Sequence, residues 1–175
     1  FRERIDVFDR MAAANNVPQH LQARAREFIR ESRVHEKYLQ AMKVADGLST
    51  TLKVNIAEHI AAHHLGKIQV FQKSSRHFKS DVASLLKSHF FEKQEKVLLT
   101  GCVCIVQKGL VLLAGFLIGP KAHWGEDMIL THEGLRLNHP AKCLAHTMLL
   151  TLERSDLLEL LHQHPEESLR IRRAA

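Results

Sequence analysis

The feature that most constrains the fold is an apolar run from Val97 to Ile118, rich in Val, Leu, Ile and Cys. Its length is close to the roughly 20 residues with which a helix crosses a membrane. Gln107, Lys108 and Gly109 interrupt the run at its centre, and a Lys there costs about 2.5–3.5 kcal/mol on membrane insertion. An antiparallel hairpin would bring this Lys to the surface at a tight turn. The run therefore predicts two buried strands joined at Gly109.

Helical spacing dominates before this run. Apolar residues recur at steps of three and four from Phe1, and again after Pro18, where the chain leaves one helix and enters the next. A further helix is expected after Asp46, with Ser49 as its N-cap. The apolar spacing of residues 80–89 predicts another helix.

Between Val97 and Leu152, short apolar segments alternate with Gly, Pro and Asn, which is typical of a compact antiparallel barrel or jelly roll. Helical spacing returns after Ser155, a candidate N-cap, and we expect Leu157 and Leu161 to be buried. Pro165 then opens another helical turn. The predicted class is α+β: N-terminal helices, an antiparallel β-roll (jelly roll), and flanking and C-terminal helices.

The charge balance permits acidic partners without choosing one. The chain has 175 residues, 25 Lys and Arg against 19 Asp and Glu, and a formal net charge of +6. Acidic and basic residues alternate within residues 2–10, which favours protein or membrane-surface contacts over nucleic acid. The first residues lack the apolar stretch of a signal peptide, and three cysteines, an odd number, favour a reducing compartment.

The sequence contains neither a Gly-x-Ser-x-Gly elbow nor a Walker loop, so an enzyme is not expected. His59 and His63 stand one helical turn apart but lack the Glu of a His-Glu-x-x-His motif and an obvious third ligand, so no metal site is expected. Cys102 and Cys104 should share one face of a strand, where a core role is favoured over a redox role.

The segment from Trp124 to Leu130 presents two carboxylates, Glu126 and Asp127, on a turn led by Gly125. A carboxylate can accept hydrogen bonds from sugar hydroxyls, and the amides of a glycine turn can hold a phosphate. One interpretation is therefore a cradle for a ribose phosphate. The other is a helix start whose acidic residues lie near its positive end.

In the order of its elements and in several motifs, the chain resembles the C-linker and cyclic-nucleotide-binding homology domain of cyclic-nucleotide-gated and ether-à-go-go-like voltage-gated cation channels. The resemblance implies a helical C-linker over residues 1–66 and the homology domain over residues 67–175. The matching segments are residues 1–8, 16–28 and 48–60 in the linker, and 105–109, 124–127, 154–161 and 164–166 in the domain.

This resemblance assigns roles to individual residues. Gly125 falls where the phosphate-binding cassette turns, and Glu126 where binding members hydrogen-bond the ribose 2′-hydroxyl. Where those members carry Arg-Thr-Ala, this chain has His139, Pro140 and Ala141. A histidine is largely neutral near pH 7 and Pro140 has neither hydroxyl nor amide donor, so charge-assisted contacts worth about 1.5–3 kcal/mol each are missing.

Arg136 lies three residues upstream of His139 and is the candidate substitute cation. The candidate ligand site, functional or degenerate, is thus Gly125, Glu126, Asp127, Arg136, His139 and Ala141. The ligand that the resemblance implies is cAMP or cGMP.

The resemblance implies a non-enzymatic, cytoplasmic regulatory module of a tetrameric cation channel, selective for potassium, in the plasma membrane. Its partners would be the other subunits of a homotetramer, contacted through the linker helices, and the pore to which it is attached. Cyclic-nucleotide binding is expected to be weak or lost. A working cAMP or cGMP sensor, the same module on a membrane exchanger, and a nucleotide-controlled transcription factor or enzyme subunit stay open as alternatives.

Overall fold

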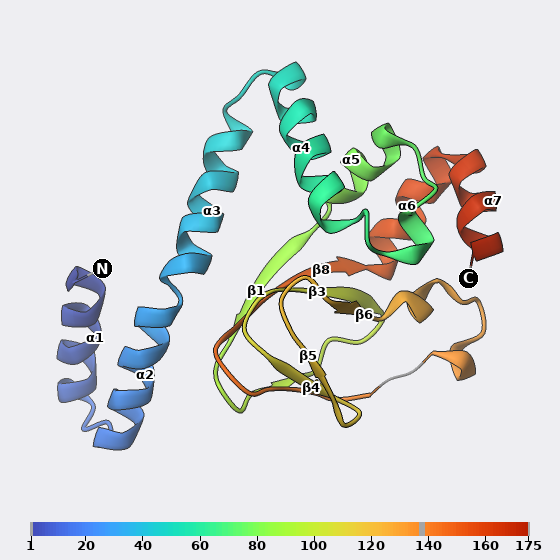
Figure 1. The fold of residues 1–175 in the computed structure, drawn as a ribbon. Coiled ribbons are helices and arrows are strands. Elements are labelled where there is room, and N and C mark those ends of the chain that lie inside the picture. The colour runs from blue at the N-terminus through green and yellow to red at the C-terminus, as the bar shows by residue number, and fades with distance from the viewer. Residues whose placement is uncertain (1, 137–138, 175) are drawn as a thin grey trace. The chain divides into compact units, whose positions relative to one another are not determined.

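The computed structural model of the protein describes residues 2–136 and 139–174. Over these residues the chain forms seven α-helices and two antiparallel sheets, which confirms the predicted α+β class (Figure 1). The chain divides into two compact units, Phe1–Lys43 and Val44–Ala175. The boundary between these units follows Lys43, whereas the resemblance implies a domain boundary after residue 66.

The first unit is helical, as its apolar spacing predicts. It comprises α1 (Arg2–Ala14), α2 (Gln19–Glu31) and most of α3 (Arg33–Asp46). The side chain of Arg26 on α2 donates from Nε to Asp9 Oδ1 on α1 at 2.8 Å. Arg4 on α1 forms an ion pair with Glu36 on α3. Charged contacts of this kind hold short helices together, although each contributes only about 0–1 kcal/mol when exposed.

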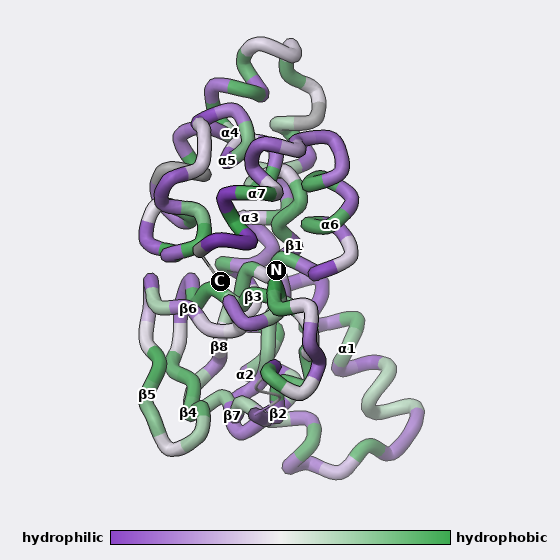
Figure 2. The backbone as a smooth tube through the Cα atoms, turned by 90° about the vertical axis from the view of Figure 1, so that its right-hand side faces the viewer, coloured by the Kyte–Doolittle hydropathy of each residue, from purple (hydrophilic) through white to green (hydrophobic). Residues whose placement is uncertain are grey.

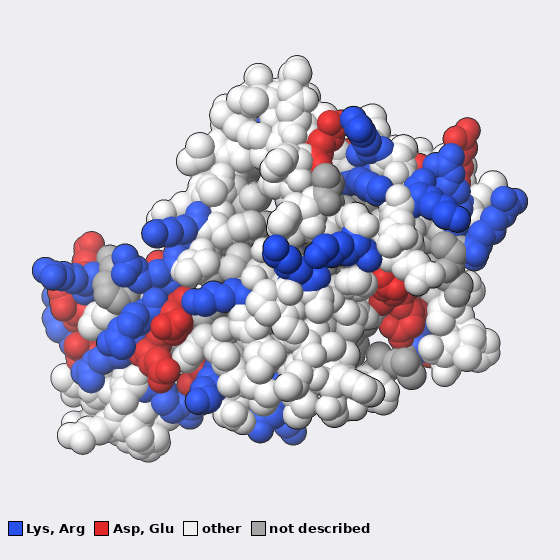
Figure 3. Space-filling view, in the orientation of Figure 1, with Lys and Arg blue, Asp and Glu red and all other residues white. Residues whose placement is uncertain are grey.

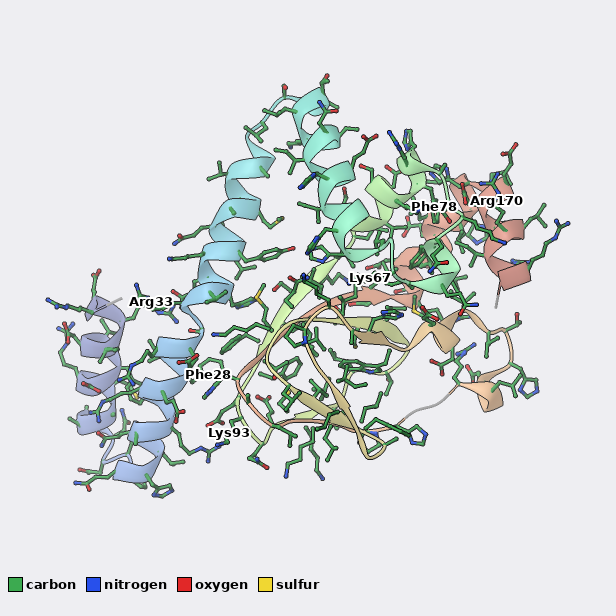
Figure 4. All side chains as sticks on the ribbon, viewed as in Figure 1. Phe28, Arg33, Lys67, Phe78, Lys93 and Arg170 are labelled. Carbon is green, nitrogen blue, oxygen red and sulfur yellow. The ribbon has the colours of Figure 1, made fainter. Side chains whose placement is uncertain are left out.

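The second unit holds four helices, which gather on one side of the sheets (Figures 1 and 2). They are α4 (Thr50–His64), α5 (Arg76–Ser84), α6 (Arg154–Gln163) and α7 (Pro165–Ala174), together with the short 3₁₀ helix η1 (Gln69–Phe71). Phe78 of α5 is fully buried in this layer, with its ring 6.4 Å from that of Phe71 and 5.4 Å from that of His164 (Figure 4). Leu157 and Leu161 are buried, as predicted.

Two helix boundaries differ from the predictions. The helix expected over residues 80–89 ends at Ser84, and His89 lies in a strand, because Leu85 N closes the last turn on Val82 O and the following residues pair with another strand. Ser155 is not an N-cap, since α6 begins one residue earlier. Arg154 N donates to Gly101 O at 3.0 Å, which ends the strand pairing there.

Each sheet has four strands. Sheet A has the order β1-β8-β3-β6 and sheet B the order β2-β7-β4-β5. The strands of sheet A are β1 (Lys87–Phe91), β8 (Thr147–Glu153), β3 (Cys102–Lys108) and β6 (His123–Trp124). Those of sheet B are β2 (Lys96–Val97), β7 (Ala141–Cys143), β4 (Val111–Leu113) and β5 (Phe116–Ile118). Buried side chains from both sheets form one core: Val97, Val106, Val111, Ala141, Cys143 and Leu149.

The apolar run includes two strands joined at Gly109, as predicted, but these two strands do not pair with one another as a hairpin. The strands on either side of Gly109 belong to different sheets, β3 to sheet A and β4 to sheet B. Gly109, with φ of +102°, turns the chain from one sheet to the other, and both strands keep buried residues. The hairpin in this run is instead β4–β5, which is coloured hydrophobic in Figure 2. Among the described residues, none of the helices is both long and apolar enough to span a membrane.

A buried carboxylate joins the last helix to α5. Glu167 on α7 is 5% exposed, and its Oε1 accepts from the backbone amide of Ser75, the N-cap of α5, at 3.0 Å and from Arg170 Nη1 at 3.2 Å. Burial alone raises the pKa of Glu167, but the hydrogen bonds from Ser75 and the positive charge of Arg170 outweigh it. The pKa therefore lies below its ordinary value near 4.5.

A carboxylate whose pKa is lowered by folding stabilises the protein above its unfolded pKa, and this contribution is lost as the pH falls through the folded pKa. We expect Glu167→Gln to lower the free energy of unfolding by about 1–3 kcal/mol at pH 7. The difference from the wild type should shrink as the pH falls below about 4.5. Urea unfolding between pH 3 and pH 7 measures both. The matched control is Glu166→Gln, at the exposed neighbouring position, which should change little; an equal effect of the two variants would contradict the assignment.

Candidate functional site

A cavity of about 200 Å³ lies where the chain between β2 and β3 meets the turn after β6. It brings together four of the six candidate residues: Gly125, Asp127, Arg136 and His139. Glu126 and Ala141 are not among its lining residues. The rest of the wall is Val97–Cys102, Trp124, Met128 and Pro140.

Gly125 fixes the turn at the base of the cavity. Its φ is +90°, a conformation that side chains disfavour, and a Cβ there would lie 2.2 Å from the carbonyl oxygen of Cys102. The turn therefore packs directly on the backbone of β3. It opens the 3₁₀ helix η2 (Glu126–Ile129), so the helix start that the sequence offers as one interpretation is present, with both acidic residues in its first turn.

Glu126 is held outside the cavity. Its Oε1 accepts from the backbone amide of Gln69 at 3.0 Å and lies 2.9 Å from His123 Nε2. The carboxylate that the resemblance places on a ribose thus joins η2 to η1. Asp127 is the carboxylate residue that lines the cavity.

Arg136 lines the cavity with its side chain 16% exposed. Its Nε donates to Leu130 O at 3.0 Å, its Nη2 donates to Thr131 O at 3.2 Å, and its Nη1 lies 3.6 Å from Glu133 Oε1. Two of the five guanidinium donors are therefore used by the loop itself. An anion in the cavity would share the remaining donors with Glu133.

The segment His139–Ala141, which stands in place of Arg-Thr-Ala, lies partly in the cavity wall and partly in the core. His139 and Pro140 are exposed and line the cavity. Ala141 is 2% exposed, pairs with Val97 and Leu113 in sheet B, and belongs to the core between the sheets. Its role in this structure is packing.

A second cavity, of about 400 Å³, shares residues 98–102 with the first and is not predicted from the sequence. Its wall includes His89, Glu153 and Arg154. Arg154 Nε donates to Met128 O at 2.8 Å, so this arginine stabilises the turn that follows Gly125. In the sequence this segment is marked only by Gly101, a glycine within the apolar run.

Comparison with known proteins adds no relative. A scan against protein-family models finds no match, and a search of curated proteins finds no significant similarity. Over the described ranges 2–136 and 139–174, His, Cys, Asp and Glu side chains form no cluster of three or more suited to a metal ion.

Alanine at Gly125 tests the close packing of the turn on β3. Gly115 is a matched control, because its φ is +87° and a Cβ there would meet no atom within 4 Å. We expect Gly115→Ala to cost about 1–2 kcal/mol in the free energy of unfolding, the price of the left-handed conformation alone. Gly125→Ala should cost several kcal/mol, since the Cys102 carbonyl must also move. Urea unfolding of both variants measures the difference; equal costs would show that the contact is easily relieved.

Proposed function

We propose that this chain is a non-enzymatic, cytoplasmic regulatory module of a tetrameric cation channel, selective for potassium, in which cyclic-nucleotide binding is weak or lost. In this proposal the two sheets are the β-roll of the resembling family, and the helices before them carry its conformational bias to the pore gate. The subunits of the homotetramer contact one another through these helices. The order of elements supports the proposal: helices, then two antiparallel sheets, then helices.

The observation that carries the proposal is the composition of the cavity. Among its described lining residues, Arg136 is the one Lys or Arg, and the loop already uses two of its donors. Glu126 is occupied by Gln69 and His123. The volume of about 200 Å³ is also below the roughly 300–1,000 Å³ of ordinary small-molecule pockets. A cyclic nucleotide would have to displace existing contacts and enlarge the cavity.

Charge distribution supports a partner of mixed charge rather than nucleic acid. On the face seen in Figure 3, Lys and Arg side chains alternate with Asp and Glu over the first helices. Arg26 with Asp9 and Arg4 with Glu36 show how these charges neutralise one another within the first unit. A nucleic-acid surface would instead gather positive charge on one face.

The second candidate function is a working cAMP or cGMP sensor. It is favoured by the joint presence of Gly125, Asp127 and Arg136 in one cavity wall. Isothermal titration calorimetry with each nucleotide separates the two functions. We expect dissociation constants of about 1 mM or weaker, equivalent to no more than about 4 kcal/mol. Low-micromolar binding that Glu126→Ala or Arg136→Ala abolishes would support the sensor instead.

A gain-of-function variant sharpens the same measurement. His139→Arg with Pro140→Thr restores the cation and hydroxyl that the resembling family carries. If the missing contacts limit affinity, each charge-assisted contact of about 1.5–3 kcal/mol should strengthen binding at least tenfold. The matched control is His132→Arg, which adds the same charge on an exposed residue that does not line the cavity. Equal gains from both would indicate non-specific attraction.

The channel assignment is tested by the coding sequence that precedes Phe1 and by the assembly of the chain. The proposal expects membrane-spanning segments with a selectivity filter directly upstream, and a fourfold assembly in the intact protein, measured by light scattering in detergent. An upstream exchanger domain, or a soluble catalytic or DNA-binding domain, would contradict it.

A further inference from the structure

Cys102 and Cys104 form a pair of thiols on one face of β3. Their Sγ atoms lie 3.6 Å apart, and both side chains are buried. The strand is held on both sides, since Cys104 pairs with Thr151 of β8 and with Trp124 of β6. The third cysteine, Cys143, lies on β7 in the other sheet and is also a free thiol.

Of the two cysteines, Cys102 borders the cavities. Cys102 lines both the cavity of about 200 Å³ and that of about 400 Å³, whereas Cys104 behind it is fully buried. A small molecule or ion that enters either cavity can therefore reach Cys102, but not Cys104 directly. Trp124 lines the first of these cavities.

The geometry disfavours a disulfide between the two thiols. A disulfide needs sulfurs about 2.05 Å apart and Cβ atoms about 3.5–4.5 Å apart. Residues i and i+2 of a strand are about 6.6 Å apart along its axis, so closing the bond would require β3 to buckle between its two neighbours.

An ion bridging the sulfurs requires no such movement. With metal–sulfur bonds of about 2.3 Å, sulfurs 3.6 Å apart subtend an angle of about 100° at the ion. This angle suits an element that binds two thiolates in a bent arrangement. It does not suit a linear two-sulfur ion, for which the sulfurs would stand about 4.6 Å apart.

The two thiols differ in acidity. The hydrogen bond from the Cys104 thiol lowers the pKa of Cys102, and the same contact together with burial raises the pKa of Cys104. Cys102 is thus the first thiolate, and the thiolate is the form that attacks electrophiles and binds soft ions.

We propose that Cys102 and Cys104 form a two-thiolate site for a soft, thiophilic ion with bent sulfur coordination, of the class represented by trivalent arsenicals. With an organic arsine oxide, two arsenic–sulfur bonds form, the two S–H protons and the arsenic-bound oxygen leave as one water, and arsenic stays trivalent. The bound group would fill part of the cavity described above. The site does not depend on the proposed channel function.

Phenylarsine oxide is the probe, added to the folded protein and followed by native mass spectrometry and by the fluorescence of Trp124, the sole tryptophan. We expect one adduct per chain that survives excess glutathione, is removed by a small dithiol, and quenches Trp124 without a change in far-ultraviolet circular dichroism. Cys102→Ala or Cys104→Ala should weaken retention about 10²–10⁴-fold, because chelation by two linked thiols is lost. Cys143→Ala is the matched control and should bind as the wild type does.

Three outcomes would overturn the proposal: no glutathione-resistant adduct on the wild-type protein, an adduct that forms only after unfolding in urea, or equal loss in Cys143→Ala. If the variants at Cys102 or Cys104 do not fold, fragmentation of the wild-type adduct decides the question. Arsenic on the segment that contains Cys102 and Cys104 supports the site, and arsenic on Cys143 refutes it.

Discussion

The pairing of β3 with β8 is the interaction on which the rest of the structure depends. It runs from Cys102 opposite Glu153 to Lys108 opposite Met148 and places β3 inside sheet A, with β6 on its other side. The buried residues of both strands supply much of the apolar area that stabilises this unit, at roughly 25 cal/mol per Å². Both cavities and the turn at Gly125 are built against this strand, so their geometry follows from its register.

The candidate site combines a well-fixed frame with few free polar groups. Gly125 packs on the β3 backbone, and Arg154 supports the same turn through Met128 O. Within this frame the two groups most suited to a nucleotide, Glu126 and Arg136, already have partners in the protein. A preorganised site normally binds well because its polar groups are already in position and are not hydrogen-bonded to the protein itself. Here the organisation serves the protein's own loops.

Much of the architecture could be predicted from local signals. The helical spacing, the break at Pro18 and the strand character of the apolar run indicated the correct class, because side-chain periodicity reflects which face is buried. The partner of each strand could not be predicted in this way. Gly109 indicated a turn, but whether it joins paired strands or two sheets depends on contacts with distant residues such as Cys143 and Met148. The same holds for His89, whose strand is formed by pairing with Leu149.

The candidate site, like the fold, could be predicted from the sequence only in part. The glycine turn was predictable because its geometry is local, and Gly125 takes the left-handed conformation that such a turn requires. The orientation of the Glu126 carboxylate was not, since its partner Gln69 is 57 residues away in the chain.

The hydrogen bond between Glu126 and Gln69 joins η2, next to the cavity, to η1, the segment after α4. A ligand that takes the carboxylate for its own hydroxyls must release the η1 amide, so the intrinsic affinity is reduced by the free energy of that contact. Reciprocity requires that loosening η1 by any other means improve ligand binding by the same factor. In the proposed function, the hydrogen bond between Glu126 and Gln69 would therefore oppose ligand binding by the free energy needed to break it.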